Sequence, residues 1–451
     1  MSFKETSTIY KGGGVVLTKL ELITRRAREN PKERFTSLCH HLNEDFLLEC
    51  FRELKRNKAP GIDGETVRGY EERLEGNLKD LVERLKRKGY RPQPVRRAYI
   101  PKDERSMRPL GIPTVEDKIV QMGVKKILEA IYEQDFVEVS YGFRPNRSCH
   151  DALEVVDKTI MTRPINYVVD MDIEKFFDTV DHKWMMECLR QRITDPNFLR
   201  LIVRFLKAGI MEEGKYKETE KGTPQGGIIS PVLANIYLHY ILDLWFERVV
   251  KKEAKGFAQL TRYADDFIVC LEKEEDAMEF RERLRERLKK FGLKISEEKS
   301  RIIEFGRKVW QEAKEGDRKV STFNFLGFTH YCDKTRRGKF KVGRKTSHKK
   351  MKLKLKEMNQ WLKNIRNCVG LKEWWQVLKQ KLIGHYHYYG ISGNMREIRI
   401  FYRKVVRIAF KWINRRSQKR SMNWEKYRKF IYEWNPLPRP KIYHLTYTLS
   451  S

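Results

Sequence analysis

Three aspartates have the side-chain type and the spacing to bind divalent cations together. Asp265 and Asp266 are adjacent in the segment LTRYADDFIVC, directly before the apolar run of residues 267–270. Asp172 ends a second apolar run, NYVVDMD, and a helical pattern follows it. If neighbouring strands bring these carboxylates together, they repel one another unless cations lie between them, and two Mg²⁺ ions about 4 Å apart would suit such a set. One ion would then activate an attacking hydroxyl group, and both would stabilise a pentavalent phosphate.

Each of these features also has an ordinary structural explanation. An Asp-Asp pair at a turn is usually a solvated hairpin tip, and Asp172 could simply cap the helix that follows it. Strand alternation places Asp170 on the same face as Asp172, where we expect a supporting role at most. Spacing alone therefore leaves a two-metal site as one of several interpretations.

The elements around the aspartates predict a domain of mixed strands and helices. Strands and helices alternate without a βαβ repeat, which favours an α+β sheet covered by helices over a doubly wound fold. After about Lys341 the pattern is helical until the segment NPLPRPKIY near the end. The predicted strands are residues 165–172, 293–306 and 323–331, and a hairpin is predicted at 260–272. The predicted helices include 173–193 and 275–292, and within 223–250 a glycine-rich loop leads into a long apolar helix.

The charge of the chain indicates a polyanionic partner. The sequence has 94 Lys and Arg against 61 Asp and Glu, a formal net charge of +33, yet 40% of its residues are hydrophobic, so we expect a folded protein. Residues 331–451 hold 32 basic and 6 acidic residues and six of the nine tryptophans. Cations interleaved with aromatic rings favour nucleic acid over a membrane surface, although most of these tryptophans should be core residues.

The cysteines and the hydropathy pattern favour a soluble protein of a reducing compartment. Seven cysteines are scattered without a CxxC pair, which argues against zinc modules and a disulfide framework. No signal peptide and no apolar run long enough to cross a bilayer are evident, so we expect no membrane partner. The expected location is the cytosol.

A series of motifs, in order along the chain, resembles the palm of a reverse transcriptase. These motifs are YVVDMDIEKFFD, GTPQGGIISPVLANIYL, RYADD, LKISEEKS and FNFLGF. Three further motifs, APGIDG, YIPK with RPLGIPTVEDKIVQ, and SYGFRPNRSCHDAL, narrow the resemblance to the group II intron-encoded lineage, also called intron maturases. The resemblance covers roughly residues 59–328 strongly and the C-terminal helices more weakly.

The resemblance implies an α+β right-hand polymerase, with fingers and a palm built on an antiparallel sheet, followed by an all-helical thumb. No paired cysteines and no HNH-like cluster follow the thumb, so we expect no DNA cleavage and priming from an existing 3′ end. The implied divisions are a flexible N-terminal arm (1–35), fingers with an N-terminal extension (36–165), a palm with the catalytic site (166–335), a helical thumb or maturase X domain (341–420) and a basic C-terminal tail (421–451).

Position by position, the resemblance also implies roles for individual residues in catalysis and nucleotide binding. Asp172, Asp265 and Asp266 match the catalytic ligands of two Mg²⁺ ions. Phe177 matches the aromatic gate that excludes a 2′-hydroxyl group; Phe176 lies next to it, and one of the two must be a core residue. The remaining nucleotide-binding matches are Lys102 and Arg108 for the triphosphate, Gln225 for the sugar and base, and Lys299 as a candidate proton donor to pyrophosphate.

Two further motifs match contacts with the nucleic acid. Phe325, Leu326 and Gly327 match the turn that grips the primer end. Arg144, Asn146 and Arg147 precede a helix and could touch template phosphates.

The implied function is RNA-directed DNA polymerisation. The implied partners are an RNA template, a DNA or RNA primer, dNTPs and a group II intron RNA whose splicing the protein would assist, and a homodimer is left open. Two alternatives remain at this stage: a splicing cofactor whose polymerase activity is dispensable, and a domesticated relative in DNA repair or phage defence.

Overall fold

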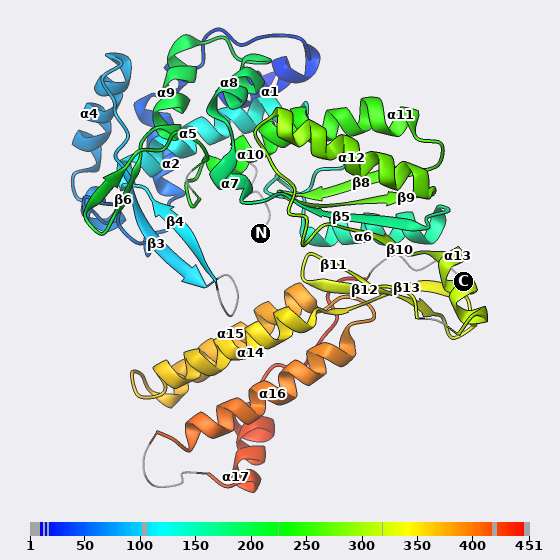
Figure 1. Cartoon of the computed structure of the whole chain (residues 1–451). Helices are drawn as coiled ribbons and strands as arrows, with labels where there is room; N and C mark the ends of the chain where they lie inside the picture. The colour runs from blue at the N-terminus through cyan, green and yellow to red at the C-terminus, as the bar shows by residue number, and fades with distance from the viewer. Residues whose placement is uncertain are drawn as a thin grey trace.

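The computed structural model describes residues 10–11, 14–15, 18–101, 106–223, 225–317, 319–416 and 422–445. The chain forms a layer of helices, a four-stranded sheet with helices on both faces, and a group of long C-terminal helices (Figure 1). In the described part of the chain, no helix is both long and apolar enough to span a bilayer.

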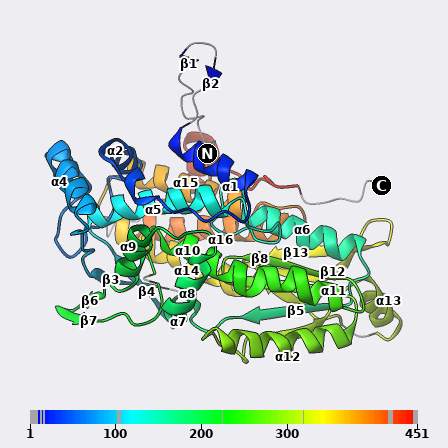
Figure 2. The ribbon, with the colours of Figure 1, turned by 90° about the horizontal axis from the view of Figure 1, so that it is seen from above.

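The sheet that carries the aspartates is antiparallel, with strand order β10-β5-β9-β8. Its strands alternate between two hydrophobic cores: Val169 and Phe267 belong to one, and Val168 and Ile268 to the other. Both views place α6 (Cys149–Thr162) and α12 (Glu274–Lys290) on opposite sides of the sheet (Figure 1, Figure 2), so both faces of its strands are buried. The strands are β5 (Tyr167–Asp172), β8 (Ala258–Tyr263), β9 (Asp266–Leu271) and β10 (Arg301–Glu304).

The helical layer is built around α5 (Val115–Tyr132), most of whose residues are buried. The other helices of this part of the chain are α2 (Glu44–Arg52), α3 (Val67–Glu71), α4 (Leu74–Lys86), α7 (Phe176–Thr179), α8 (His182–Arg190), α9 (Pro196–Leu206), α10 (Ser230–Leu238) and α11 (Lys251–Glu253), with a 3-10 turn at Cys39–His41 and π-helical turns at His239–Asp243 and Phe246–Val250.

The predicted flexible arm (1–35) is wrong for its second half. Residues 19–29 form α1 (Lys19–Glu29), which a capping box at Thr18 begins and which packs against α5. Ile23 and Ala27 of α1 are buried, and buried Arg192 donates a hydrogen bond to the Ala27 carbonyl at 3.1 Å. The pairs of residues described nearer the N-terminus form β1 (Tyr10–Lys11) and β2 (Gly14–Val15).

Two smaller sheets flank these layers. A hairpin in the proline-rich segment before residue 114 consists of β3 (Val95–Pro101) and β4 (Met107–Ile112), with β6 (Ile210–Glu212) and β7 (Lys215–Lys217) completing its sheet. The second sheet, β11-β12-β13, follows α13 (Arg307–Glu315) and consists of Phe323–Phe325, Phe328–Lys334 and Phe340–Thr346.

The C-terminal region is helical from His348, not from residue 341 as predicted, because residues 340–346 form β13. Buried Asn394 joins this strand to the helices, since its side chain accepts from the Thr346 backbone N–H and donates to the Thr346 hydroxyl, both at 2.8 Å. The helices are α14 (His348–Ile365), α15 (Leu371–Tyr389), α16 (Met395–Ile413) and α17 (Trp424–Lys429), followed by a π-helical turn at Phe430–Trp434.

Candidate active site

The three aspartates lie at the same end of two neighbouring strands. Asp172 is the last residue of β5, and the register places it opposite Asp266, the first residue of β9. Asp265 lies in the two-residue turn that joins β8 to β9. The sequence-predicted meeting of a strand end with a hairpin turn is therefore present in the fold.

The hairpin turn is tight because the backbone of another segment packs against it. Ala264 has a φ of +58°, in the left-handed region that residues other than glycine rarely adopt. A Cβ added to Gly142 would lie 2.3 Å from the Ala264 nitrogen. Glycine at position 142, in the SYGFRPN motif, thus permits the close approach that supports the turn before Asp265.

Mutual repulsion among carboxylates marks this strand end. Partial desolvation, followed by the charges of Asp170, Asp265 and Asp172, raises the pKa of Asp266 to about 7. Desolvation and the charge of Asp172 raise the pKa of Asp170 to about 6. The Asp266 side chain is exposed, so water reaches its carboxyl group. A bound cation would remove the repulsion by the neighbouring carboxylates, which is one cause of the raised pKa.

A lysine side chain already neutralises one of these carboxylates. Lys299 Nζ donates to Asp172 Oδ2 at 2.6 Å, and this contact raises the pKa of Lys299. Among the residues that the structure describes, no three His, Cys, Asp or Glu side chains stand close enough to hold an ion in their present positions. The aspartates are therefore assembled at one strand end, with Asp172 turned to Lys299.

A fully buried ion pair lies directly behind the turn. Arg262 of β8 donates to Asp243 Oδ1 at 2.7 Å through Nε, and neither side chain is exposed to solvent. The same guanidinium donates to the Ala264 carbonyl at 2.9 Å, to Asn235 at 3.1 Å and to the Ser140 hydroxyl at 2.8 Å. Arg262 thus links the turn before Asp265 to α10 and to the π-helical turn that contains Asp243.

The two phenylalanines after Asp172 have different surroundings. Phe176 is 2% exposed and packs in the core, whereas Phe177 is half-buried, with the two ring centroids 5.3 Å apart. Asp178 Oδ1 accepts a long hydrogen bond of 3.5 Å from Gln225 Nε2. Phe177 is therefore the member of the pair that can meet a ligand, and Gln225 lies on the same side of the site.

The sequence comparisons agree with this arrangement. Residues 100–330 match the family "Reverse transcriptase (RNA-dependent DNA polymerase)", and these residues include all three aspartates. The chain belongs to this reverse transcriptase family.

Relatives and solved structures differ in how closely they match this chain. This chain is 44% identical to the Group II intron-encoded protein LtrA of Lactococcus lactis over 225 residues. The matched region covers 49% of this chain and 37% of LtrA. It is 37% identical to Protein YkfC of Escherichia coli, over 51% of this chain and 62% of that protein. Telomerase from Candida tropicalis is similar at 15% identity over 53% of each chain, with a TM-score of 0.40, too weak a likeness to support an argument. The predicted likeness to group II intron-encoded proteins is confirmed, although the chain spans only part of the length of these relatives.

The turn predicted to grip the primer lies beside the aspartates. Leu326 has a φ of +49° and Gly327 a φ of +83°, and they form the turn between β11 and β12. A hydrogen bond from the Leu326 backbone opposes the rise in the pKa of Asp266. Tyr388 of α15 donates to the Leu326 carbonyl at 3.0 Å, so the turn connects the sheet that carries the aspartates to the C-terminal helices. Phe325, also assigned to the grip, is buried.

Of the two residues predicted to bind the triphosphate, the structure describes one, on the hairpin of β3 and β4. Arg108 is exposed on β4, opposite Ile100 of β3, whereas Lys102 lies outside the described residues. The loop with Gln225 contacts the same hairpin, since Gly111 donates its backbone N–H to the Gln225 carbonyl. Gly226 has a φ of +104°, and an added Cβ would lie 2.8 Å from the Gly111 carbonyl oxygen, so glycine is required there.

The predicted template contact of Arg144 is wrong. Its side chain is 4% exposed and donates to Glu133 and to the Val137 and Ser140 carbonyls, each at 2.9 Å. The guanidinium of Arg147 is also bound within the protein, since it donates to the Glu138 side chain at 2.7 Å. Asn146 is exposed, and its template contact stays a prediction.

The buried ion pair of Arg262 and Asp243 was not predicted from the sequence. A charged residue within the apolar run of β8 was a usable signal, because an arginine in a strand with two covered faces requires a buried acceptor. Its partner lies 19 residues earlier in an apolar helix, where no pattern of spacing identifies it.

We expect the carboxylates to make the metal-free protein less stable as the pH rises. The pKa values of about 6 for Asp170 and about 7 for Asp266 exceed the ordinary value of 3.8, so the folded state keeps protons that the unfolded chain releases. This contribution to stability is fully present below pH 3.8 and is lost as the pH passes 6 to 7. Melting temperatures of the wild type and of Asp266→Asn, measured without metal at pH 5 and pH 8, test this contribution. The variant should exceed the wild type in melting temperature by more at pH 8 than at pH 5. An equal difference at both pH values would contradict the repulsion between the carboxylates.

Proposed function

We propose that the chain is an RNA-directed DNA polymerase that joins a primer 3′-hydroxyl group to the α-phosphate of a dNTP, with release of pyrophosphate. The proposal rests on the strand register that places Asp172 opposite Asp266, directly after the turn that contains Asp265. All three aspartates lie within the residues that match the reverse transcriptase family.

The donor set at this strand end fits divalent cations. Carboxylate oxygens are the ligands that Mg²⁺ prefers, and the raised pKa of Asp266 reflects an excess of negative charge. Asp172, Asp265 and Asp266 would hold the ions, and we propose two Mg²⁺. When bound, the ions supply charge that lowers the pKa of the primer hydroxyl group and offsets charge on the phosphate.

The side chains around the aspartates would orient the nucleotide. Half-buried Phe177 would lie under the sugar, Gln225 would pack near the sugar and base, and Arg108 with Lys102 would bind the triphosphate. Lys299, whose Nζ is 2.6 Å from Asp172 Oδ2, would pass a proton to the departing pyrophosphate.

The surrounding elements support a right-hand arrangement. In this proposal the helical layer with the β3–β4 hairpin forms the fingers, the four-stranded sheet forms the palm, and α14 to α16 form the thumb. The Tyr388–Leu326 hydrogen bond would let the thumb and the primer grip move together. Basic residues exceed acidic ones by 26 between residues 331 and 451, which suits a surface that binds a nucleic-acid duplex.

A second role, binding and assisting the splicing of a group II intron RNA, is favoured by the names of the relatives. LtrA is named a group II intron-encoded protein, and a relative from Arabidopsis thaliana is named Nuclear intron maturase 4, mitochondrial. Both roles would use the same basic surface, and we propose that they coexist in one nucleoid-associated protein of the cytosol.

Primer extension on a defined RNA template tests the proposed polymerase function. Purified protein, an annealed DNA primer, dNTPs and Mg²⁺ should yield cDNA that ends at the template 5′ end. A matched reaction with an unrelated RNA, to which the primer cannot anneal, should yield none. Absence of template-dependent product across a range of Mg²⁺ and salt concentrations would contradict the proposal.

Phe177→Ala should weaken the preference for dNTPs over rNTPs by up to about 10²-fold, because removing the ring opens space for a 2′-hydroxyl group. Single-nucleotide incorporation with each nucleotide class measures the ratio. Phe176→Leu serves as the matched control, since Phe176 is buried in the core and should affect stability but not the ratio. An unchanged ratio in Phe177→Ala would remove Phe177 from the role of gate.

A further inference from the structure

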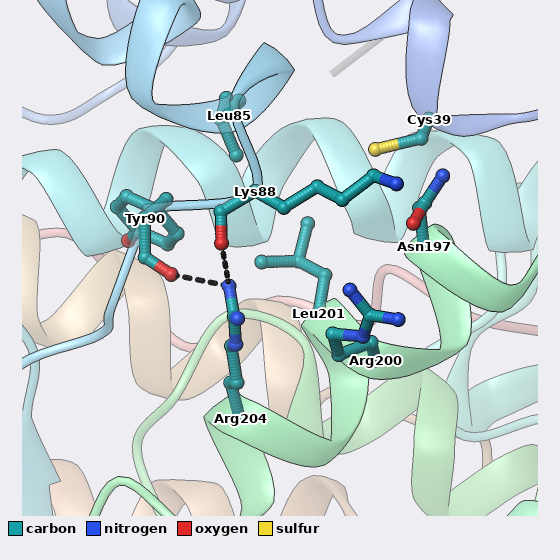
Figure 3. A pocket seen from close by; sticks show the side chains of 8 residues that line it. All are labelled: Cys39, Leu85, Lys88, Tyr90, Asn197, Arg200, Leu201 and Arg204. Atoms are coloured by element: carbon teal, nitrogen blue, oxygen red, sulfur yellow. Dashed lines mark hydrogen bonds between the residues drawn. The ribbon is translucent and has the colours of Figure 1, made fainter.

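A small open pocket between the end of α4 and the side of α9 collects positive charge. Lys88 extends across it toward Cys39 and Asn197, while Arg200 and Arg204 rise from α9 (Figure 3). In both overall views, α4 and α9 lie at one end of the molecule and the catalytic sheet lies toward the other (Figure 1, Figure 2). The pocket is therefore separate from the aspartates.

The basic side chains of this pocket lack acidic partners. Among the residues with described positions, no Asp or Glu side chain forms an ion pair with Lys88, Arg200 or Arg204. The nearby carboxylate of Asp195 is taken up by the backbone, since it accepts from the N–H groups of Leu38, Cys39, Asn197 and Phe198 at 2.6 to 3.1 Å. Within the described part of the chain, no ion pair therefore neutralises these three basic side chains.

Arg204 is fixed in an orientation that leaves part of its guanidinium available. One of its terminal nitrogens donates to the Lys88 carbonyl at 3.0 Å and to the Tyr90 carbonyl at 2.7 Å, as Figure 3 shows. Desolvation and the charges of Arg91 and Arg200 lower the pKa of Arg204. The crowding of like charges is unfavourable in the free protein, and a bound anion would relieve it.

The end of α4 brings the Lys88 side chain to the pocket. Lys88 has the left-handed conformation, with a φ of +60°, that commonly ends a helix, and the N–H groups of Gly89 and Tyr90 after it both donate to the Arg84 carbonyl. From this position the lysine side chain extends over the pocket toward Asn197 (Figure 3).

We propose that this pocket binds a phosphate group of an RNA backbone, as an RNA-binding site outside the catalytic cleft. An arginine held by its other edge and a neighbouring lysine suit the oxygens of a phosphate, and the amide of Asn197 adds a neutral donor. The choice of RNA over a free phosphate rests on the proposed function, because an intron-binding polymerase meets RNA along more than its catalytic cleft. The contact would position RNA and would be independent of sequence.

Charge reversal in the pocket tests this proposal. The variant is Lys88→Glu with Arg200→Glu, and Arg200→Glu alone serves in case the left-handed backbone at position 88 does not tolerate glutamate. The control is Lys183→Glu with Lys290→Glu, two exposed lysines on α8 and α12 that change the net charge equally. Transfer RNA at 150 mM salt is the structured probe, and a short RNA–DNA template–primer duplex reports on the catalytic cleft.

We expect the pocket variant to bind transfer RNA about tenfold more weakly than the control variant and to have a shallower dependence of log K on log salt, by about 0.7–0.9 for each lost phosphate contact. Its primer extension on the short duplex should equal that of the control, which separates failure of this site from failure of the polymerase assignment. Equal RNA affinities for the two variants would overturn the proposal.

Cys39 provides an independent readout in the unmodified protein. It is partly buried beside Lys88, so transfer RNA should slow its alkylation several-fold, as measured by mass spectrometry, while the charge-reversed variant should lose this protection. No protection by RNA would overturn the site. Full protection by inorganic phosphate, without any effect of the variant on RNA affinity, would overturn RNA as the ligand and leave a site for small anions.

Discussion

Replacing Asp265 and Asp266 with alanine together should lower the rate of primer extension by about 10³-fold or more. The two carboxylates lie at the turn opposite Asp172, and groups that act as one catalytic unit typically cost several orders of magnitude in rate when they are removed. The rate of single-nucleotide incorporation at saturating dNTP measures the effect. Normal cDNA synthesis by this variant would overturn the assignment of the active site.

The same variant has a signature that separates lost chemistry from lost folding. Removing two charges from a group of four mutually repelling carboxylates should leave the metal-free protein at least as stable as the wild type. Mg²⁺ or Mn²⁺ should raise the melting temperature of the wild type and not that of the variant, because only the wild type binds the ion in its folded state. Glu286→Ala with Glu315→Ala, two exposed acids, is the charge-matched control and should retain both activity and the metal response.

Splicing measured with the same variant separates the two proposed roles. If binding of intron RNA uses the basic surface alone, a variant without the two aspartates should still assist splicing while cDNA synthesis is lost. This outcome would support a splicing function that is independent of polymerisation. Loss of both activities, with the fold retained, would show that RNA binding also depends on the metal site.

The sheet that carries the aspartates could be predicted from the sequence because its signals are local. The strand expected at 165–172 is β5 (Tyr167–Asp172), and the hairpin expected at 260–272 is β8 and β9 with its turn at Ala264 and Asp265. Continuous apolar runs ended by charged residues indicate strands that are buried on both faces. The meeting of Asp172 with Asp266 then required only that the two strands be neighbours.

The parts that could not be predicted depend on partners far away in the sequence. Arg144 reads as a basic loop residue before a helix, and only the fold shows that Glu133 and two carbonyl groups surround it. Residues 340–346 lie in a strongly basic stretch that reads as helical, yet pairing with β12 makes them a strand. Which of Phe176 and Phe177 faces the core likewise follows from the left-handed conformation of Lys175, φ +46°, which no periodicity reveals.

Breaking the buried Arg262–Asp243 pair should have the largest effect on stability. Asp243→Ala leaves the Arg262 charge without a partner in a site that solvent does not reach, and such a loss typically costs about 3–5 kcal/mol. Urea unfolding of the metal-free protein should show a lower midpoint, and Glu286→Ala should not. Arg262→Met combined with Asp243→Leu should recover most of the lost stability, because a buried ion pair can often be replaced by apolar side chains of similar volume.

The double replacement should not recover polymerase activity. Arg262 does more than neutralise Asp243, since it also donates to the carbonyl of Ala264, whose left-handed conformation aims the following aspartates, and to Ser140 beside the Gly142 contact. Methionine can fill the space but cannot donate these hydrogen bonds. We therefore expect a stable protein whose primer extension remains at least about tenfold below wild type, with a higher Mg²⁺ requirement, as is usual when residues that orient metal ligands are lost. Recovery of both stability and activity would show that Arg262 only fills space behind the turn.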